Sequence, residues 1–131
     1  MSCSDETCLF CDASKAILRN ELAYARFDDY PVNPGHVLII PFRHFASFFD
    51  ATAAERAALS ALVDEARAIV DAQFAPGGYN FGVNIGTIAG QSVMHVHMHL
   101  IPRYAGDVEN PKGGVRGVIP SRQKYTPPQP A

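Results

Sequence analysis

The sequence predicts an α+β fold, in which an antiparallel sheet of about five strands packs against one long helix, with a short helix near the N-terminus. One long segment repeats apolar residues at three- and four-residue steps, and strand-sized apolar segments flank it with hairpin-length connections. With 131 residues, 47% of them hydrophobic, the chain is long enough to bury a core. We expect residues 1–125 to form one domain and residues 126–131 to be a flexible tail.

The first elements are short. Cys11–Asn20 predicts a short helix, and Leu22–Phe27 alternates like a strand. Asp28–Gly35 is dense in turn-forming residues. His36–Pro41 is an apolar run that predicts a buried strand ended by its proline.

The long helix has the clearest signals in the chain. Thr52 and Glu55 have the spacing of a capping box, which marks a helix start. One face of the helix is apolar, formed by Leu59, Leu62, Val63, Ala66, Ile69 and Val70. Pro76-Gly77-Gly78 is expected to end it.

Two more strands complete the expected sheet. Tyr79–Ile85 predicts a strand, Gly86–Gly90 a loop, and His95–Ile101 another strand. After Pro102 the pattern predicts no regular element.

Composition narrows the function classes. The net charge of −2 shows that the chain has no excess of basic residues of the kind that nucleic-acid binding needs. No apolar run reaches the roughly 18 residues of a membrane span. The N-terminus has no signal-peptide pattern, so we expect a cytoplasmic protein. Disulfides are rare in that compartment, so Cys8-Leu-Phe-Cys11 predicts half of a metal site.

Three of the five histidines lie in one predicted strand, His95-Val-His97-Met-His99. Because side chains alternate along a strand, all three imidazoles are expected on one face. Three polar rings side by side are poor core material, since each needs hydrogen-bond partners. The pattern indicates either a catalytic zinc site with an open water position or a row of catalytic imidazoles.

The neighbouring sequence favours the imidazole row. No carboxylate lies nearby in sequence to orient zinc-bound histidines. The loop before the strand, residues 86–92, has glycines whose N–H groups could approach an anion, with Gln91 and Ser92 as added donors. An imidazole beside a phosphate site is a suitable nucleophile near pH 7.

Residues 90–103, GQSVMHVHMHLIPR, resemble the signature of the histidine-triad (HIT) family, in which three histidines alternate with apolar residues. Pro34–Pro41 and Val83–Gly86 extend the similarity to roughly residues 8–105. The resemblance implies a HIT-like antiparallel sheet. It also implies a nucleotide hydrolase or nucleotidyl transferase that acts at the α-phosphate.

The resemblance assigns catalytic roles to four residues. His97, the middle histidine, would be the nucleophile that forms a nucleotidyl-histidine. His99 and His36 would line the phosphate site, and the Ser92 hydroxyl would contact the α-phosphate or the leaving oxygen. His36 has a second interpretation, as a residue that merely caps its strand.

Substrate-binding residues also follow from the resemblance. Asn84 would contact phosphate, with Gln91 beside Ser92, and Asp28 would accept a ribose hydroxyl. Asn84 could instead close a turn, and Asp28 could start one before Pro31. Arg26 and Phe27 sit where an apolar base pocket is expected, so the base preference stays open.

A structural zinc site is also implied, on Cys8, Cys11, His44 and His95. The spacing of the two cysteines matches structural zinc sites. In the alternative, His44 is a surface histidine, the cysteines pack as small hydrophobes, and His95 only forms hydrogen bonds.

The C-terminal segment resembles the branch with dinucleoside-polyphosphate hydrolases, so Ap4A-like substrates or related nucleotide esters are expected. Arg116, near Lys112 in a glycine-rich context, could bind the polyphosphate or be a solvated basic residue. Any Mg²⁺ would arrive with the substrate.

The alternatives to this function are a purine nucleoside phosphoramidase and a nucleotide-binding zinc module with weak catalysis. The resemblance implies a homodimer.

Overall fold

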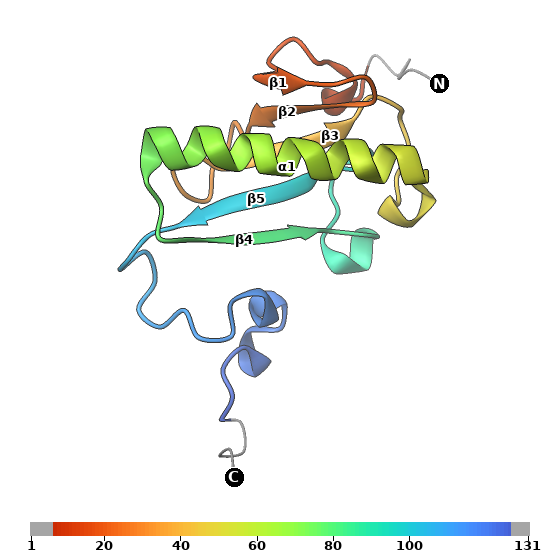
Figure 1. The fold of residues 1–131 in the computed structure, drawn as a ribbon. Helices are drawn as coiled ribbons and strands as arrows, with labels where there is room; N and C mark the ends of the chain where they lie inside the picture. Colours follow the sequence, from red (N-terminus) through yellow and green to blue (C-terminus); the bar gives the residue numbers. More distant parts are fainter. Residues whose placement is uncertain (1–6, 127–131) are drawn as a thin grey trace.

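The fold is a five-stranded antiparallel sheet with one long helix across it, seen in a computed structural model that describes residues 7–126 (Figure 1). The strands of this sheet are β1 (Leu18–Arg19), β2 (Ala23–Phe27), β3 (Val37–Pro41), β4 (Gly78–Val83) and β5 (Met98–Arg103). Their spatial order is β1-β2-β3-β5-β4. The predicted α+β architecture is therefore confirmed.

The helix α1 spans Ala53–Phe74 and begins as the sequence predicts. The Glu55 N–H donates to the Thr52 hydroxyl oxygen at 3.0 Å, and the Thr52 N–H donates to the Glu55 carboxylate at 2.9 Å. These reciprocal bonds form the capping box. The helix ends at Ala75, which adopts the left-handed conformation just before Pro76.

One face of the sheet packs against α1. The core between them contains the buried helix residues Leu59, Leu62, Ala66 and Val70. Alternate residues of three strands complete this core: Ala23, Ala25, Val37, Ile39, Met98 and Leu100. Burial of this apolar surface fixes which way each central strand faces.

The opposite face of the sheet is covered only in part, by the N-terminal segment. Phe10 packs there against Tyr24, Leu38 and Ile40. The Tyr24 hydroxyl donates to the Phe10 carbonyl oxygen at 2.6 Å. This face positions the candidate active site.

The predicted helix at Cys11–Asn20 is wrong. A 3₁₀ turn at Leu9–Cys11 precedes the edge strand β1. The Ile17 N–H donates to the Ala25 carbonyl and the Asn20 N–H to the Ala23 carbonyl, at 2.8 and 2.9 Å. A ten-residue helix is marginal alone, and pairing with β2 satisfies the same backbone groups.

The histidine strand is shorter than predicted, because β5 begins at Met98 rather than His95. The Val96 N–H donates to the Phe45 carbonyl, at 2.8 Å, so the chain before Met98 bonds to the segment after β3. The strand predicted at Tyr79–Ile85 is likewise displaced, to Gly78–Val83.

After β5 the described chain forms 3₁₀ turns at Gly114–Val118 and Pro120–Arg122, which lie beyond β4 (Figure 1). Of the tail expected at residues 126–131, all but Thr126 lies outside the described residues. Among the described residues, no helix is both long and apolar enough to cross a membrane.

Candidate active site

Three strands align the candidate site residues in rows across the partly covered face. In one row Arg26 on β2 is paired with Leu38 on β3, which is paired with His99 on β5. In the next row the Asp28 N–H donates to the His36 carbonyl oxygen at 2.9 Å. The sheet register thus brings Arg26 and Leu38 beside His99, which follows each of them by more than 60 positions in the sequence.

His97 is held in one orientation. Its ring is 7% exposed and packs against the Phe10 ring, with the two centroids 4.7 Å apart. Its Nδ1 lies 2.8 Å from the His95 carbonyl oxygen, which can only accept a hydrogen bond. Nδ1 therefore donates this bond, which leaves Nε2 as the ring nitrogen that the His95 carbonyl does not engage.

His36 and His99 form a hydrogen-bond relay. The Val32 N–H donates to His36 Nδ1 at 3.1 Å, so His36 carries its proton on Nε2. That Nε2 lies 3.0 Å from His99 Nδ1, which accepts the bond. His99 therefore carries its proton on Nε2 and can donate it to a ligand.

Burial keeps both rings of this relay neutral at pH 7. Burial is the main cause that lowers the pKa of His99 to about 4, and the neighbouring His97 and His36 add to the effect. The pKa of His36 is lowered by burial as well, although nearby Asp28 opposes that shift.

The two carboxylate oxygens of Asp28 make different contacts. Its Oδ1 accepts the Tyr30 N–H at 2.9 Å, and this contact starts a turn, as one of the two sequence interpretations of Asp28 expected. Its Oδ2 lies 3.6 Å from His36 Nε2, beside the relay. The carboxylate thus both starts the turn and stays close to the site.

A pocket of about 290 Å³ joins His97, His99 and Asp28, whereas His36 lies behind His99 and does not line it. It is lined by Leu9, Phe10, Arg26, Asp28, Asp29, Tyr30, Leu38, Ser92, Val93, His97 and His99. The sequence did not lead us to expect Phe10 and Leu38 among the residues that line this pocket. Phe10 lies between the two cysteines, and Leu38 points to the histidine face by strand alternation, so both signals were present.

Two predicted donors have other partners in the structure. The buried Gln91 side chain accepts the Gly86 N–H at 2.9 Å and donates to the Ala46 and Val93 carbonyls. Within the loop, the N–H groups of residues 89–91 donate to the Gly86 and Thr87 carbonyls. The backbone N–H groups of Gly86 and residues 89–91, which were expected to bind an anion, therefore form hydrogen bonds within the loop. Gln91 stabilises the loop conformation.

Two other predicted residues do not line this pocket. Asn84 follows β4 and is half-buried. Arg116 bonds the Gln123 and Arg122 carbonyls and stacks on the Tyr125 ring. Of the substrate-binding residues predicted, only Asp28 lines the pocket itself.

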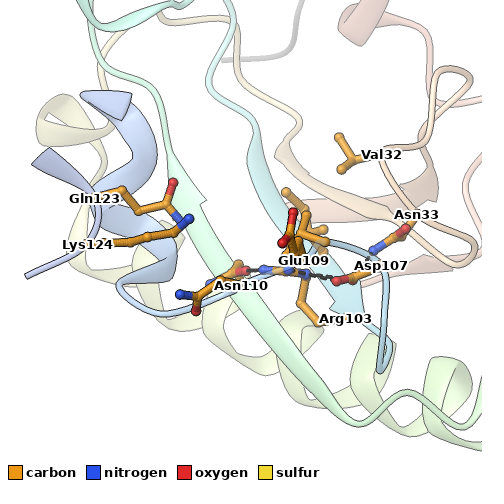
Figure 2. A pocket seen from close by; sticks show the side chains of 11 residues that line it. Val32, Asn33, Arg103, Asp107, Glu109, Asn110, Gln123 and Lys124 are labelled. Carbon is orange, nitrogen blue, oxygen red and sulfur yellow. Dashed lines mark hydrogen bonds and ion pairs between the residues drawn. The ribbon is translucent and has the colours of Figure 1, made fainter. Parts of the chain in front are cut away.

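A larger pocket, of about 580 Å³, lies between the ends of β4 and β5 and the C-terminal segment (Figure 2). Arg103 crosses it, donating to Asp107 at 2.8 and 2.9 Å and to Asn80 at 2.6 Å. It contains no histidine, and its central charges already neutralise each other. Size alone therefore does not identify the candidate active site, and the smaller pocket is the one that His97 and His99 line.

The predicted zinc ligands converge. Cys8, Cys11, His44 and His95 place one ligand atom each within 4.8 Å of the others. The two Nδ1 atoms lie 3.1 Å apart, and the sulfur–nitrogen distances are 3.4 to 3.7 Å. Around a tetrahedral zinc these separations are about 3.3 and about 3.6 Å. The residues fit the metal.

His95 is oriented to be such a ligand. Its Nε2 donates to the Pro41 carbonyl oxygen at 2.8 Å, which leaves the Nδ1 lone pair directed at the cysteines. Burial lowers the pKa of His95, which keeps that lone pair unprotonated. Cys8 is a free thiol, whereas Cys11 is disulfide-bonded here and must be reduced before it can bind zinc.

The alternative catalytic zinc on the triad does not match this geometry. The potential metal-ligand groups among residues 7–126 place His95 in one group and His99 in another, and His97 in neither. The three triad rings therefore do not share one group of potential metal ligands.

Comparison with known proteins places this geometry in a family context. The chain matches the HIT domain family over residues 12–106. It is 39% identical over 92 residues to the AP-4-A phosphorylase of Mycobacterium tuberculosis, covering 70% of this chain and 47% of that protein. The asymmetrical bis(5′-nucleosyl)-tetraphosphatase of Schizosaccharomyces pombe is 36% identical over 94 residues, 72% of this chain and 52% of that one.

The chain therefore spans about half the length of these two relatives. Among solved structures, it resembles a zinc-bound histidine triad family protein from Mycobacterium smegmatis. The TM-score is 0.70 at 27% identity, over 79% of this chain and 80% of that one.

Proposed function

Because this chain belongs to the HIT domain family, we propose that it is a nucleotide hydrolase that splits dinucleoside polyphosphates through a nucleotidyl-histidine on His97. The observation that carries this proposal is the bond from His97 Nδ1 to the His95 carbonyl oxygen. It leaves Nε2 as the ring nitrogen available to the pocket, which is also lined by Asp28, the proposed acceptor of a ribose hydroxyl.

In the first step, His97 Nε2 attacks the α-phosphorus. A nitrogen–phosphorus bond forms, the bond to the bridging oxygen breaks, and the leaving polyphosphate takes that electron pair. The His95 carbonyl oxygen stabilises the positive charge that develops on the ring. The His99 Nε2–H and the exposed Ser92 hydroxyl would donate to the phosphate oxygens.

In the second step, water attacks the same phosphorus in line with the nitrogen. The nitrogen–phosphorus bond breaks, its electron pair returns to His97, the water releases a proton to solvent, and a nucleoside monophosphate leaves. The relay from Val32 through His36 keeps His99 in its donor tautomer during both steps.

Substrate binding is proposed on the predicted residues. The Asp28 carboxylate would accept a ribose hydroxyl, and Gln91 would keep Ser92 in place from within the loop. Asn84 and Arg116 would contact the phosphates beyond the α position, where a longer substrate extends out of the pocket. Mg²⁺ would enter bound to the polyphosphate.

Zinc supplies structural cross-linking in this scheme. Its proposed ligands, Cys8, Cys11, His44 and His95, join the N-terminal segment to the chain on either side of the site. Phe10 lies between the two cysteines and contacts the His97 ring. The site would therefore fix one wall of the pocket.

We also propose a homodimer in the cytoplasm. Strand β4 ends the sheet order and leaves an edge, and Phe81 on that strand is 45% exposed. The cytoplasm would keep the cysteines reduced for zinc. Sedimentation at micromolar concentration and cell fractionation test these proposals, and a monomer or a secreted protein would refute them.

The test of the proposed activity is product analysis with Ap4A. The zinc-loaded, reduced protein should release AMP and ATP. If inorganic phosphate is the better acceptor, ADP replaces AMP, as the name of the M. tuberculosis relative suggests. A strong preference for adenosine phosphoramidates would support the phosphoramidase instead, and tight AMP binding without turnover would support a binding module.

A further inference from the structure

Arg26 is an unusual residue for an apolar wall. It projects from the middle of β2 into the pocket that contains His97 and His99, and it is only 3% exposed. We propose that Arg26 reads the base of the bound nucleotide and that the enzyme favours guanine over adenine. This inference rests on the proposed function, because it assumes that a nucleotide occupies this pocket.

The position of Arg26 suits a base rather than a phosphate. Arg26 lies two strands away from His99 in the row Arg26–Leu38–His99, which is about 10 Å at the usual strand spacing. On its own strand it is two residues from Asp28, the proposed ribose acceptor. A nucleotide with its α-phosphate at His97 and its ribose at Asp28 would place its base over Leu38, facing Arg26.

The guanidinium is preorganised. Its Nη2 lies 2.8 Å from Asp29 Oδ2, and its Nε donates to the Phe27 carbonyl oxygen at 3.3 Å. These two bonds use two of the five N–H groups of an arginine. The remaining N–H groups have no other bonding partner among the described residues, so they can serve a ligand in the pocket.

An arginine distinguishes the purines because it only donates. Guanine presents two acceptors, O6 and N7, which match the paired N–H groups of a guanidinium. Adenine presents a donor at N6 beside N7, and that donor would face the guanidinium N–H. Leu9, Phe10, Leu38 and Val93 add apolar surface to the same pocket, against which a base plane can pack.

A purely structural role for Arg26 is the competing explanation, since it neutralises Asp29. Lys15 provides a matched control, because its Nζ lies 3.1 Å from the same Asp29 oxygen but Lys15 is exposed and does not line the pocket. A structural role predicts similar effects of removing either cation. A role in base recognition predicts that only Arg26 changes selectivity.

The test compares kcat/KM for diguanosine tetraphosphate (Gp4G) and diadenosine tetraphosphate (Ap4A). Both are measured in the wild type, Arg26→Leu and Lys15→Ala. We expect the wild type and Lys15→Ala to prefer Gp4G by about 10-fold, and Arg26→Leu to lose that preference. Equal rates or an adenine preference in the wild type would overturn the proposal. A preference that survives in Arg26→Leu would overturn it too.

Binding of the products separates this proposal from the proposed activity. Calorimetry with GMP and AMP needs no turnover, so a guanine preference in binding supports the role of Arg26 even if neither dinucleotide is split. Equal affinities for GMP and AMP in the wild type would refute it, and that measurement does not depend on whether Arg26→Leu folds. Arg26→Lys, which keeps the charge without the paired donors, should also lose selectivity.

Discussion

Two pairs of histidines in this protein have nearly the same spacing and different chemistry. His44 and His95 bring their Nδ1 atoms within 3.1 Å, while His36 Nε2 and His99 Nδ1 are 3.0 Å apart. The first pair lies with Cys8 and Cys11, the second with Asp28. Both groups are compact enough to suggest a metal site.

The hydrogen-bond partners outside each pair distinguish them. The Pro41 carbonyl fixes the proton of His95 on Nε2 and turns its Nδ1 lone pair toward the sulfur atoms of Cys8 and Cys11. The Val32 N–H instead fixes the lone pair of His36, so its proton points at His99. In the first pair His95 therefore directs a lone pair toward the cysteine sulfurs, which suits a cation, and in the second pair His99 keeps a donor N–H, which suits an anion.

His97 lies between the group that contains His95 and the group that contains His99, and it is hydrogen-bonded to the first. Its Nδ1 donates to the backbone of His95, and its ring lies 5.2 Å from that of His99. The group of Cys8, Cys11, His44 and His95, called the metal-type group below, is thus hydrogen-bonded to His97 through the His95 backbone. The relay group, His36 and His99 with Asp28, lies on the other side of the His97 ring. The following predictions test this division.

Removing the nucleophile should have the largest effect. We expect His97→Ala to lower kcat/KM by at least about 1000-fold, because the proposed mechanism has no other group that forms the covalent intermediate. Zinc content and cooperative unfolding should persist, since His97 belongs to neither group. Steady-state kinetics and metal analysis check this, and a rate within 10-fold of the wild type would contradict it.

Breaking the metal-type group should mainly affect stability. We expect Cys8→Ser to lower Tm by roughly 10 °C in the reduced, zinc-loaded protein, because a metal cross-link is lost. Activity measured at low temperature should fall far less than in His97→Ala. A chelator should destabilise the wild type and have little further effect on Cys8→Ser. An unchanged Tm and zinc content would remove the zinc site from the account.

Breaking the relay should mainly affect rate. We expect His36→Ala to lower kcat/KM by about 10- to 100-fold, the range for partners that orient an imidazole. His36→Gln can both accept from Val32 and donate to His99, so it should recover part of the loss. Equal rates for the two variants would show that His36 acts by packing alone.

Acid should weaken the relay group. His99 has a pKa of about 4 when folded and near 6.5 when unfolded, so the folded state resists protonation. Its contribution to stability should be complete above pH 6.5 and be lost as the pH falls toward 4. Urea unfolding between pH 7.5 and 4.5 measures this loss. A His99→Gln variant should show a flatter profile, and an identical profile would contradict the assignment.

The smallest effect is expected far from both groups. We expect Thr52→Ala to reduce the free energy of unfolding by about 1 kcal/mol and Tm by about 4 °C, because it removes one side of the capping box. The site should be unaffected, so kcat/KM at low temperature should match the wild type. A loss of activity would show that α1 also shapes the pocket.

Sequence patterns predicted what depends on local chemistry. The helix start at Thr52 and the strands at β2 and β3 follow from spacing and alternation, and the structure confirms them. The zinc ligands were predicted from the family resemblance, and their atoms do converge. The helix predicted at Cys11–Asn20 failed because β2 offers that segment a better backbone partner, which is a tertiary effect.

The tautomers could not be predicted from sequence. They depend on single backbone groups, the Pro41 carbonyl and the Val32 N–H, whose positions follow from the folded loops. The positions of Phe10 and Arg26 also depend on the tertiary structure. The N-terminal turn brings Phe10 against His97, and the sheet register pairs Arg26 with Leu38.

The central claim is tested most directly by trapping the intermediate. The enzyme is mixed with Ap4A labelled at the α-phosphorus and quenched within milliseconds in alkali, where nitrogen–phosphorus bonds of histidine survive. We predict label on His97 by peptide mapping and none in His97→Ala. Label on another residue, or full turnover with no protein-bound label, would contradict the mechanism.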